Sequence, residues 1–136
     1  MMNQTQNGSG KIRAVYADDK DTLRMTMEML LPIINPNIEL KMVENGRDLV
    51  SLVQQEKPDV LITDNEMPYL HGVEAIAQLR MGGYTGKSLV VSGNPERFEQ
   101  DLKTHKVTTP YLAKPYGLTE LKAKLQEVWP EYFKAE

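Results

Sequence analysis

Cysteine is absent from this chain of 136 residues, so disulfide bonds and thiolate metal sites are excluded. No apolar run approaches the ~18 residues of a membrane-spanning helix, and the polar start of the chain lacks the apolar segment of a signal peptide. Lysine and arginine form no basic stripe and the net charge is -3, which gives no reason to expect direct binding of nucleic acid. These absences predict a cytoplasmic protein that contacts neither membrane nor nucleic acid.

The length of the chain fits one compact domain, which can bury roughly two-thirds of its unfolded surface. We expect residues 1–10, which are polar and contain glycine, to form a flexible tail. Residues 11–129 are expected to form the domain, and residues 130–136 a C-terminal aromatic extension. The aromatic residues at this end, Trp129, Tyr132 and Phe133, either dock on the core as a lid or offer a contact for a partner or a homodimer.

Extended and helical patterns alternate five times, which is typical of an α/β fold with a parallel sheet covered by helices. Apolar and β-branched runs predict strands over 12–17, 38–43, 60–63, 88–91 and 110–113. Apolar residues at helical spacing predict helices over 22–31, 46–56, 72–81, 96–103 and 118–128. We expect Pro32 to end the first helix, because proline lacks the N–H group and crowds the preceding turn.

Acidic and basic side chains stand where three of these strands end. Asp64 ends the third strand and is followed by a segment containing Pro68, through which neither a strand nor a helix can continue. Asp18 and Asp19 follow the first strand, and Lys114 follows the fifth. The carboxyl ends of parallel strands meet at the edge of the sheet where ligands bind, so we expect these groups to lie together.

Four motifs occupy strand ends in a fixed order. They are Ala17-Asp18-Asp19, Leu61 to Pro68 followed by Gly72 and Glu74, Val90-Val91-Ser92-Gly93, and Tyr111-Leu112-Ala113-Lys114-Pro115-Tyr116. Together they resemble the receiver domain of bacterial two-component response regulators, over residues 11 to 129. The resemblance implies a flavodoxin-like (βα)5 fold, a sheet of order 2-1-3-4-5 and a phosphoacceptor aspartate, which would be Asp64.

Three carboxylates at one site would repel one another. At an effective dielectric constant of ~20, each pair ~4 Å apart costs about 4 kcal/mol, so the cluster must take up a proton or bind a cation. Mg²⁺ fits, since it prefers carboxylates and accepts phosphate oxygens. The resemblance implies that Asp19 and Asp64 bind Mg²⁺ directly, that Asp18 acts largely through water, and that the backbone carbonyl of Glu66 is a further ligand. The alternatives are that Asp64 only caps the next helix and that Asp18-Asp19 is a solvated turn.

Three other side chains complete the expected site. Lys114 supplies a cation that can reach a phosphoryl oxygen, and the resemblance implies a cis peptide bond before Pro115. Ser92 offers a hydroxyl to another phosphoryl oxygen. Tyr111 matches the family's switch aromatic, with an ordinary packed tyrosine as the alternative. Phosphorylation would draw Ser92 inward and let Tyr111 turn, changing the surface of the fourth helix, fifth strand and fifth helix.

The sequence thus predicts a signalling switch that takes a phosphoryl group from a histidine kinase or histidine phosphotransfer protein and acts on a downstream protein target or effector. It is not predicted to be an enzyme beyond its own phosphoryl transfer and autodephosphorylation. The chain is either a receiver without an effector domain or a fragment of a longer regulator. Two alternatives are a receiver-like interaction module that is never phosphorylated, and an Mg²⁺-dependent aspartyl phosphohydrolase of the haloacid dehalogenase type. The second expects an aspartate where Glu66 stands.

Some residues depart from the family pattern or have no settled role. His71 stands where the family commonly has an acidic residue, and we assign it no role. The side chain of Glu66 is expected either to reach Lys114 or to crowd an incoming water. Met25 and Met29 fall on the outer side of the first helix, where they are either soft contacts for a phosphorylation partner or ordinary exposed side chains.

Overall fold

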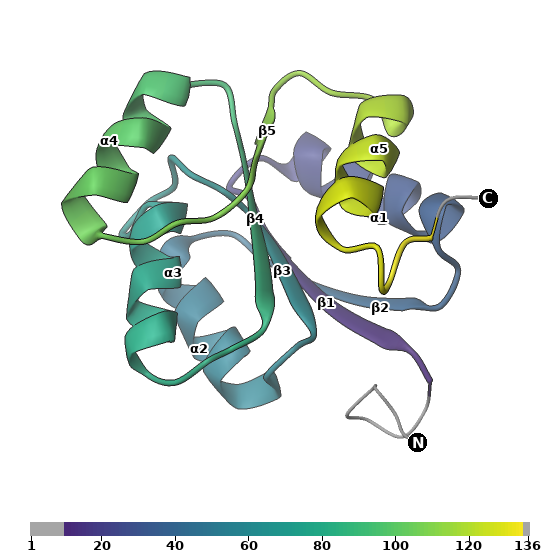
Figure 1. Cartoon of the computed structure of the whole chain (residues 1–136), viewed down its shortest axis with the longest axis horizontal. Helices are drawn as coiled ribbons and strands as arrows, with labels where there is room; N and C mark the ends of the chain where they lie inside the picture. Colours follow the sequence, from purple (N-terminus) through teal and green to yellow (C-terminus); the bar gives the residue numbers. More distant parts are fainter. Residues whose placement is uncertain (1–9, 135–136) are drawn as a thin grey trace.

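The computed structural model describes residues 10–134 and contains a five-stranded parallel sheet of order β2-β1-β3-β4-β5 (Figure 1). The strands are β1 Ile12–Ala17, β2 Ile38–Val43, β3 Val60–Asp64, β4 Lys87–Ser92 and β5 Tyr111–Ala113. The helices are α1 Asp21–Ile34, α2 Gly46–Glu56, α3 Gly72–Met81, α4 Pro95–His105 and α5 Leu118–Val128. The predicted flavodoxin-like fold is confirmed, and no described helix is long and apolar enough to cross a membrane.

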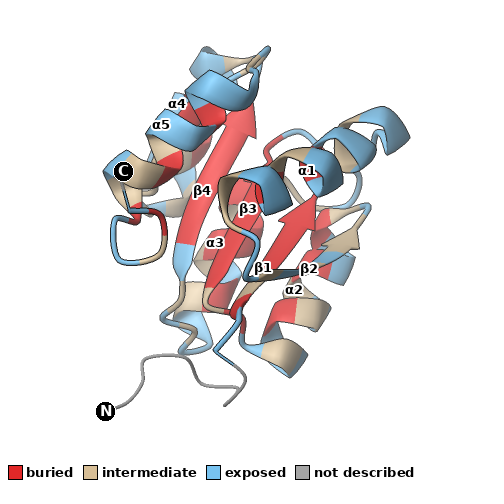
Figure 2. Cartoon of the chain, turned by 90° about the vertical axis from the view of Figure 1, so that its right-hand side faces the viewer, coloured by how far each residue is buried: buried red, intermediate tan, exposed pale blue. Residues whose placement is uncertain are grey.

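The sheet is the middle of three layers, with α1 and α5 on one face and α2, α3 and α4 on the other (Figure 1). Side chains of a strand point alternately to the two faces. In β3, Ile62 accordingly packs with α1 and α5, whereas Leu61 packs with α2 and α3. Figure 2 shows the consequence: the central strands are buried along their length, while the helices bury only their inner sides.

Helix α1 continues through Pro32, so the prediction that this proline ends the helix is wrong. The helix runs to Ile34, and the Asn35 N–H donates to the Leu31 carbonyl at 2.9 Å. Pro32 removes a hydrogen bond only from the carbonyl of Glu28, and both residues are exposed, so solvent can satisfy that carbonyl. Burial of Leu31 in the core keeps the last turn in place.

An asparagine caps the N-terminus of both α2 and α4. The side chain of Asn45 accepts a hydrogen bond from the Asp48 N–H at 2.8 Å, and that of Asn94 accepts one from the Arg97 N–H at 3.0 Å. Each satisfies a helix N–H group that has no partner within its own helix. Pro95 occupies the first turn of α4, where its missing N–H removes no helical hydrogen bond.

The aromatic end of the chain packs on the core. Trp129 and Phe133 are buried beside α1 and α5, with their ring centroids 6.1 Å apart. The side chain of Asn35 donates to the Tyr132 carbonyl at 2.8 Å, which ties this end to the turn after α1. Of the two alternatives from the sequence, the lid therefore matches the structure. Residues 1–9 and 135–136 lie outside the described part of the chain, so the flexible tail stays a prediction.

Candidate functional site

Three carboxylates meet at the carboxyl edge of the sheet. Asp18 and Asp19 follow β1 and Asp64 ends β3, and one carboxylate oxygen from each lies within 4.8 Å of the others. Asp18 and Asp64 are buried, whereas Asp19 is exposed and lies on the solvent side of the cluster. Lys114, after β5, places its Nζ 3.2 Å from an oxygen of Asp18 and 3.1 Å from an oxygen of Asp64. The expected convergence of these strand ends is present.

The two oxygens of Asp64 have different partners. Oδ1 accepts hydrogen bonds from the Asn65 N–H at 2.9 Å and from Lys114 Nζ at 3.1 Å. Among the described residues, no hydrogen bond or ion pair reaches Oδ2. Burial raises the pKa of the Asp64 carboxyl above its usual range, Asp18 raises it further, and Lys114 opposes both effects. The carboxylate is thus fixed in orientation by one oxygen and available through the other.

Asp18 is held by a buried tyrosine that sequence reasoning missed. The Tyr16 hydroxyl donates to Oδ2 of Asp18 at 2.8 Å, and the Lys20 N–H donates to Oδ1 at 3.0 Å. Burial, together with Tyr116 and Asp18, raises the pKa of the Tyr16 hydroxyl, so it stays protonated and can donate. Residues two apart on a strand face the same side, so the contact between Tyr16 and Asp18 could have been predicted from their spacing.

The donor set fits a hard divalent cation. Three carboxylates and the single ammonium of Lys114 leave two negative charges in the pocket. Lys20 approaches Asp19 to 3.7 Å only from the exposed side, where solvent and salt screen its charge. Clustered carboxylate oxygens with an open side suit Mg²⁺, which retains several waters when protein-bound.

Gly72 allows α3 to begin directly against the end of β3. A Cβ atom at this position would lie 2.3 Å from the carbonyl oxygen of Asp64 and 2.9 Å from Cγ2 of Thr63, both impossibly close. Absence of a side chain at Gly72 therefore positions the turn that carries Asp64.

Asn65 ties this turn together and was not predicted from the sequence. It is fully buried, and its N–H group holds Asp64, as described above. Its carbonyl accepts from the Gly72 N–H at 2.7 Å and its side-chain oxygen from the Val73 N–H at 3.0 Å, so it caps α3 from outside the helix. Its side-chain amide donates to Asp101 of α4 at 2.9 Å, and Nδ1 of His71 lies 2.8 Å from the same Asp101 oxygen.

Ser92 and Tyr111 are linked through the end of β4. The Ser92 hydroxyl is buried and accepts from the Asn94 N–H at 3.0 Å. The Tyr111 hydroxyl donates to the Ser92 carbonyl at 2.7 Å, and its ring packs on Phe98 of α4 with centroids 4.6 Å apart. The structure thus places the predicted switch pair in contact with each other and with α4.

Two expectations about single groups have clear outcomes. The side chain of Glu66 is exposed and accepts a hydrogen bond from the Asn94 amide at 3.3 Å. Of its two expected alternatives, the reach to Lys114 is therefore wrong, and the crowding of an incoming water stays a prediction. The peptide bond between Lys114 and Pro115 is cis, as the resemblance implied.

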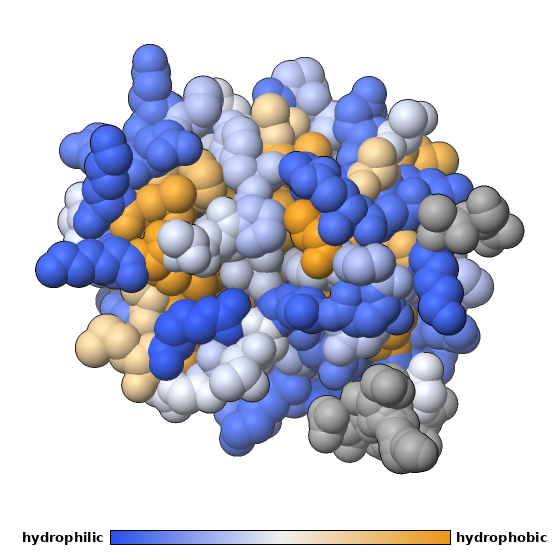
Figure 3. Space-filling model, viewed as in Figure 1, coloured by the Kyte–Doolittle hydropathy of each residue, from blue (hydrophilic) through white to orange (hydrophobic). Residues whose placement is uncertain are grey.

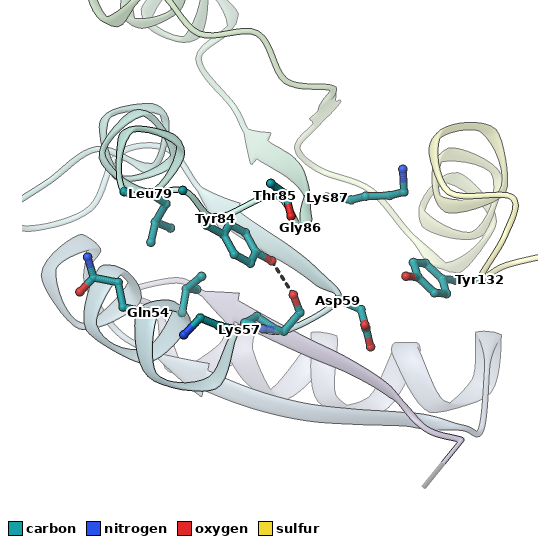
Figure 4. A pocket seen from close by; sticks show the side chains of 13 residues that line it. Gln54, Lys57, Asp59, Leu79, Tyr84, Thr85, Gly86, Lys87 and Tyr132 are labelled. Carbon is teal, nitrogen blue, oxygen red and sulfur yellow. Dashed lines mark hydrogen bonds between the residues drawn. The ribbon is translucent and has the colours of Figure 1, made fainter. Parts of the chain in front are cut away.

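A hollow lies at the opposite edge of the sheet (Figure 4). It has a volume of about 630 Å³ and is bordered by the residues before β3 and β4, with Tyr84 and Tyr132 on its sides. The Tyr84 hydroxyl donates to the Pro58 carbonyl at 2.7 Å, so the proton of this hydroxyl is already used within the protein. The hollow does not gather carboxylates as the Asp64 edge does.

A sequence profile described as the response regulator receiver domain matches residues 14–126. The chain belongs to the response regulator receiver family. The receiver domain is 30% identical over 131 residues to an uncharacterized response regulatory protein of Vibrio cholerae, covering 93% of this chain and 47% of that protein. It is 29% identical over 115 residues to the response regulator MprA of Mycolicibacterium vanbaalenii, covering 85% and 49%. The chain spans about half the length of these relatives.

Solved structures share the fold of this receiver domain. The chemotaxis response regulator CheY4 of Vibrio cholerae matches with a TM-score of 0.75 and 24% identity, over 87% of this chain and 98% of that one. The receiver domain of the Pseudomonas aeruginosa sensor kinase PA1611 matches with a TM-score of 0.75 and 18% identity, over 92% and 99%. That second structure is described with a magnesium ion coordinated in its active site cleft.

Proposed function

We propose that this receiver domain is a phosphorylation-dependent signalling switch whose phosphoacceptor is Asp64. The observation that carries the proposal is the meeting of Asp18, Asp19, Asp64 and Lys114 from three separate strand ends. Phosphoryl transfer requires an acceptor oxygen, cationic groups and donors that hold the transferred oxygens. A receiver domain is a signalling module, and its proposed chemistry acts only on itself.

The proposed donor is a phosphohistidine on a histidine kinase or phosphotransfer protein. Oδ2 of Asp64 attacks phosphorus, the bond from phosphorus to the histidine nitrogen breaks, and the electron pair of that bond stays on the nitrogen. Meanwhile Asn65 N–H and Lys114 hold Oδ1, so the attacking carboxylate does not need to reorient. The product is an acyl phosphate on Asp64, which the same site later hydrolyses.

The carboxylates of Asp18, Asp19 and Asp64 and the backbone carbonyl of Glu66 would hold Mg²⁺, with Asp18 acting largely through water. When bound, Mg²⁺ supplies positive charge that neutralises the phosphoryl oxygens. Lys114 adds a second positive charge, already 3.1 Å from Asp64, that would stabilise the oxygens as charge develops.

The proposed response begins at Ser92. Its hydroxyl would leave the Asn94 N–H to donate to a phosphoryl oxygen, which opens space for Tyr111 and shifts the surface formed by α4, β5 and α5. We expect beryllofluoride, an analogue of the phosphoryl group, to change amide hydrogen exchange in α4 of the wild-type chain. Ser92→Ala should still form the acyl phosphate but should not show these changes. An unaltered exchange response in the variant would remove Ser92 from the mechanism.

The partners we propose are the histidine-containing donor and a downstream protein target or effector. Direct binding of nucleic acid is not part of the proposal, although one matching structure is the DNA-binding LuxR-family regulator of Staphylococcus aureus, with a TM-score of 0.74 and 25% identity. That match covers 86% of this chain and 98% of the solved chain. A cytoplasmic location and a homodimer stay predictions from the sequence.

The two alternative functions predict different results. A phosphohydrolase of the haloacid dehalogenase type needs an acid two residues after the nucleophile to act on the substrate, but the Glu66 side chain is exposed and bonded to Asn94. Turnover of a small phosphate ester would favour that class. An interaction module that is never phosphorylated would show no adduct with any donor.

The experiment that tests the proposal measures intact mass after incubation with Mg²⁺ and acetyl phosphate. We expect one phosphate adduct that is absent from Asp64→Asn and absent when the metal is chelated. Asp19→Ala should suppress it through weaker metal binding, whereas Asp48→Asn, which changes an exposed carboxylate at the start of α2, should leave it unchanged. An adduct of equal yield on Asp64→Asn would overturn the assignment.

A further inference from the structure

Helix α4 is attached to the rest of the receiver domain by few side chains. The structure describes every residue of this helix, and only Phe98 and Asp101 are buried. Leu102 is partly buried beside them, and apolar side chains are visible between α4 and α3 in the space-filling view (Figure 3). One of the two buried anchors of the helix is thus a carboxylate, which is an expensive group to bury unless it is paired.

The carboxylate of Asp101 is bound to the turn after Asp64 through its Oδ2 atom. Its Oδ2 atom lies 2.9 Å from the Asn65 amide nitrogen and 2.8 Å from Nδ1 of His71, and Arg97 approaches its Oδ1 atom to 3.9 Å. Burial alone would raise the pKa of Asp101, but the hydrogen bonds from His71 and Asn65 outweigh it and lower the pKa. The group is therefore held as a charged carboxylate at neutral pH.

Asn65 connects Asp101 to Asp64 by direct hydrogen bonds to both. The side-chain amide of Asn65 binds Asp101, its side-chain oxygen caps α3 at Val73, and its N–H group holds Oδ1 of Asp64. The chain of contacts from α4 to the carboxylate thus consists of two hydrogen bonds and one intervening residue. A rotation of the Asn65 side chain would disturb the cap of α3 and the turn that carries Asp64 together.

We propose that Asp101 is a positioning residue for the phosphoacceptor: by holding Asn65, it makes the placement of α4 set the rate at which Asp64 is phosphorylated. The inference rests on the proposed function of Asp64. A protein that binds α4 and preserves the Asp101 contact would favour phosphorylation, and one that breaks it would slow phosphorylation.

Phe98, the other buried residue of α4, connects the helix to the predicted switch residues. Phe98 packs on Tyr111, whose hydroxyl binds the Ser92 carbonyl, whereas Asp101 lies one turn further along and binds the Asp64 turn. Helix α4 therefore contacts the predicted switch residues through one side chain and the phosphoacceptor turn through the next. Both contacts must move when the helix moves.

The test compares the rate of phosphorylation by acetyl phosphate at saturating Mg²⁺ in matched variants. Asp101→Ala should lower the maximal rate by about tenfold with little change in the acetyl phosphate concentration for half-maximal rate, since orientation and not donor binding is lost. The control, Glu99→Ala, removes an exposed carboxylate from the same helix and should stay within about twofold of wild type. Asp101→Asn keeps an acceptor for the Asn65 amide and should recover most of the rate.

A double-mutant cycle separates positioning from a general loss of structure. Asn65→Ala alone should slow phosphorylation at least as much as Asp101→Ala, because it also loses the hydrogen bond from the Val73 N–H. The double variant should be no slower than Asn65→Ala, because the contact that Asp101→Ala removes is then already absent. The amide hydrogens of Asn65 and Val73 should exchange faster in Asp101→Ala and not in Glu99→Ala, a readout that needs no phosphorylation.

The outcomes distinguish the two proposals. A wild-type chain that takes no phosphate overturns the proposed function and this inference with it. A wild-type chain that reacts, together with an Asp101→Ala variant of equal rate or with strictly additive losses in the cycle, overturns the inference and leaves the function of Asp64 standing.

Discussion

The ionised form of the Asp64 carboxyl is disfavoured by its surroundings when no metal is bound. Burial and the nearby Asp18 raise its pKa, and the single ammonium of Lys114 does not fully compensate. A group whose pKa is raised on folding favours the folded state in its protonated form. The ionised form that the reaction needs is therefore maintained at the expense of stability, as is common where function requires a buried charge.

We predict that Asp64→Asn stabilises the metal-free receiver domain at pH 7. The penalty of ionised Asp64 is absent below the unfolded pKa of about 3.9, grows as the pH rises through the raised folded pKa, and is constant above it. The melting temperature of the variant should therefore exceed that of wild type by a few degrees at pH 7, and the gap should close near pH 4.

Thermal melts in chelator between pH 3.5 and pH 8 would measure this difference. Glu99→Gln, which neutralises an exposed carboxylate, serves as the control and should show no comparable gain. A variant less stable than wild type at pH 7 would mean that the ion pair with Lys114 outweighs burial. In a separate measurement without chelator, Mg²⁺ should raise the melting temperature of wild type more than that of Asp64→Asn, because the variant binds the metal more weakly.

The junction between β3 and α3 depends on the absence of a side chain. Gly72 begins α3 where a Cβ would overlap the Asp64 carbonyl, and the two Asn65 oxygens cap the first turn of the helix. The helix and the strand end therefore cannot be displaced separately. A change at this junction should affect stability and phosphorylation together.

Gly72→Ala is expected to lower the free energy of unfolding by about 2 kcal/mol, because the added methyl forces backbone atoms apart. It should also slow phosphorylation of Asp64, measured by intact mass. Gly82→Ala is the matched control, since the nearest atom to a Cβ there is 3.5 Å away and its φ is -83°. Denaturant unfolding that gives both variants wild-type stability would contradict the close approach at Gly72.

The elements themselves were largely predictable, because apolar periodicity and strand-end motifs determine them. All five strands and all five helices occur where the sequence indicated, with ends that differ by a few residues. Pro32 was misjudged because sequence alone does not tell whether the carbonyl that loses its hydrogen bond, that of Glu28, faces solvent. The packing of Leu31 decided the outcome.

The convergence of Asp18, Asp64 and Lys114 was predictable because parallel strands share one edge. The contacts of Asn65 and Asp101 were not, since they join segments 36 positions apart through side chains. One signal was available: Asp101 falls three residues after Phe98, on the apolar side of its helix, where an acid needs a partner.

The receiver domain as a whole presents different surfaces on its two sides. The α4 side carries the contacts to Tyr111 and Asn65, whereas α1 exposes Met25, Met29 and Ile33 at intervals of four residues, each more than half accessible to solvent. Beside α1 a groove of about 360 Å³ extends to Lys114 and Pro115. We propose that the phosphohistidine donor docks on the α1 side and that the response is read on the α4 side.

The double substitution Met25→Ser and Met29→Ser should therefore slow phosphoryl transfer from phosphorylated histidine phosphotransfer domains by about tenfold, through lost apolar contact. Labelling by acetyl phosphate, which needs no docking, should be unchanged. Met81→Ser removes a methionine that is 89% exposed at the end of α3 and is the control. Equal transfer rates in the double variant would place the donor elsewhere.

The burial of Trp129 gives these measurements an internal probe. It is the chain's single tryptophan and only 2% of it is accessible, among aliphatic and aromatic neighbours of α1 and α5. Its fluorescence should accordingly be blue-shifted in the native protein and move to longer wavelength on denaturation. Loss of tertiary structure in any of the variants can thus be followed optically, without a label and separately from the chemistry at Asp64.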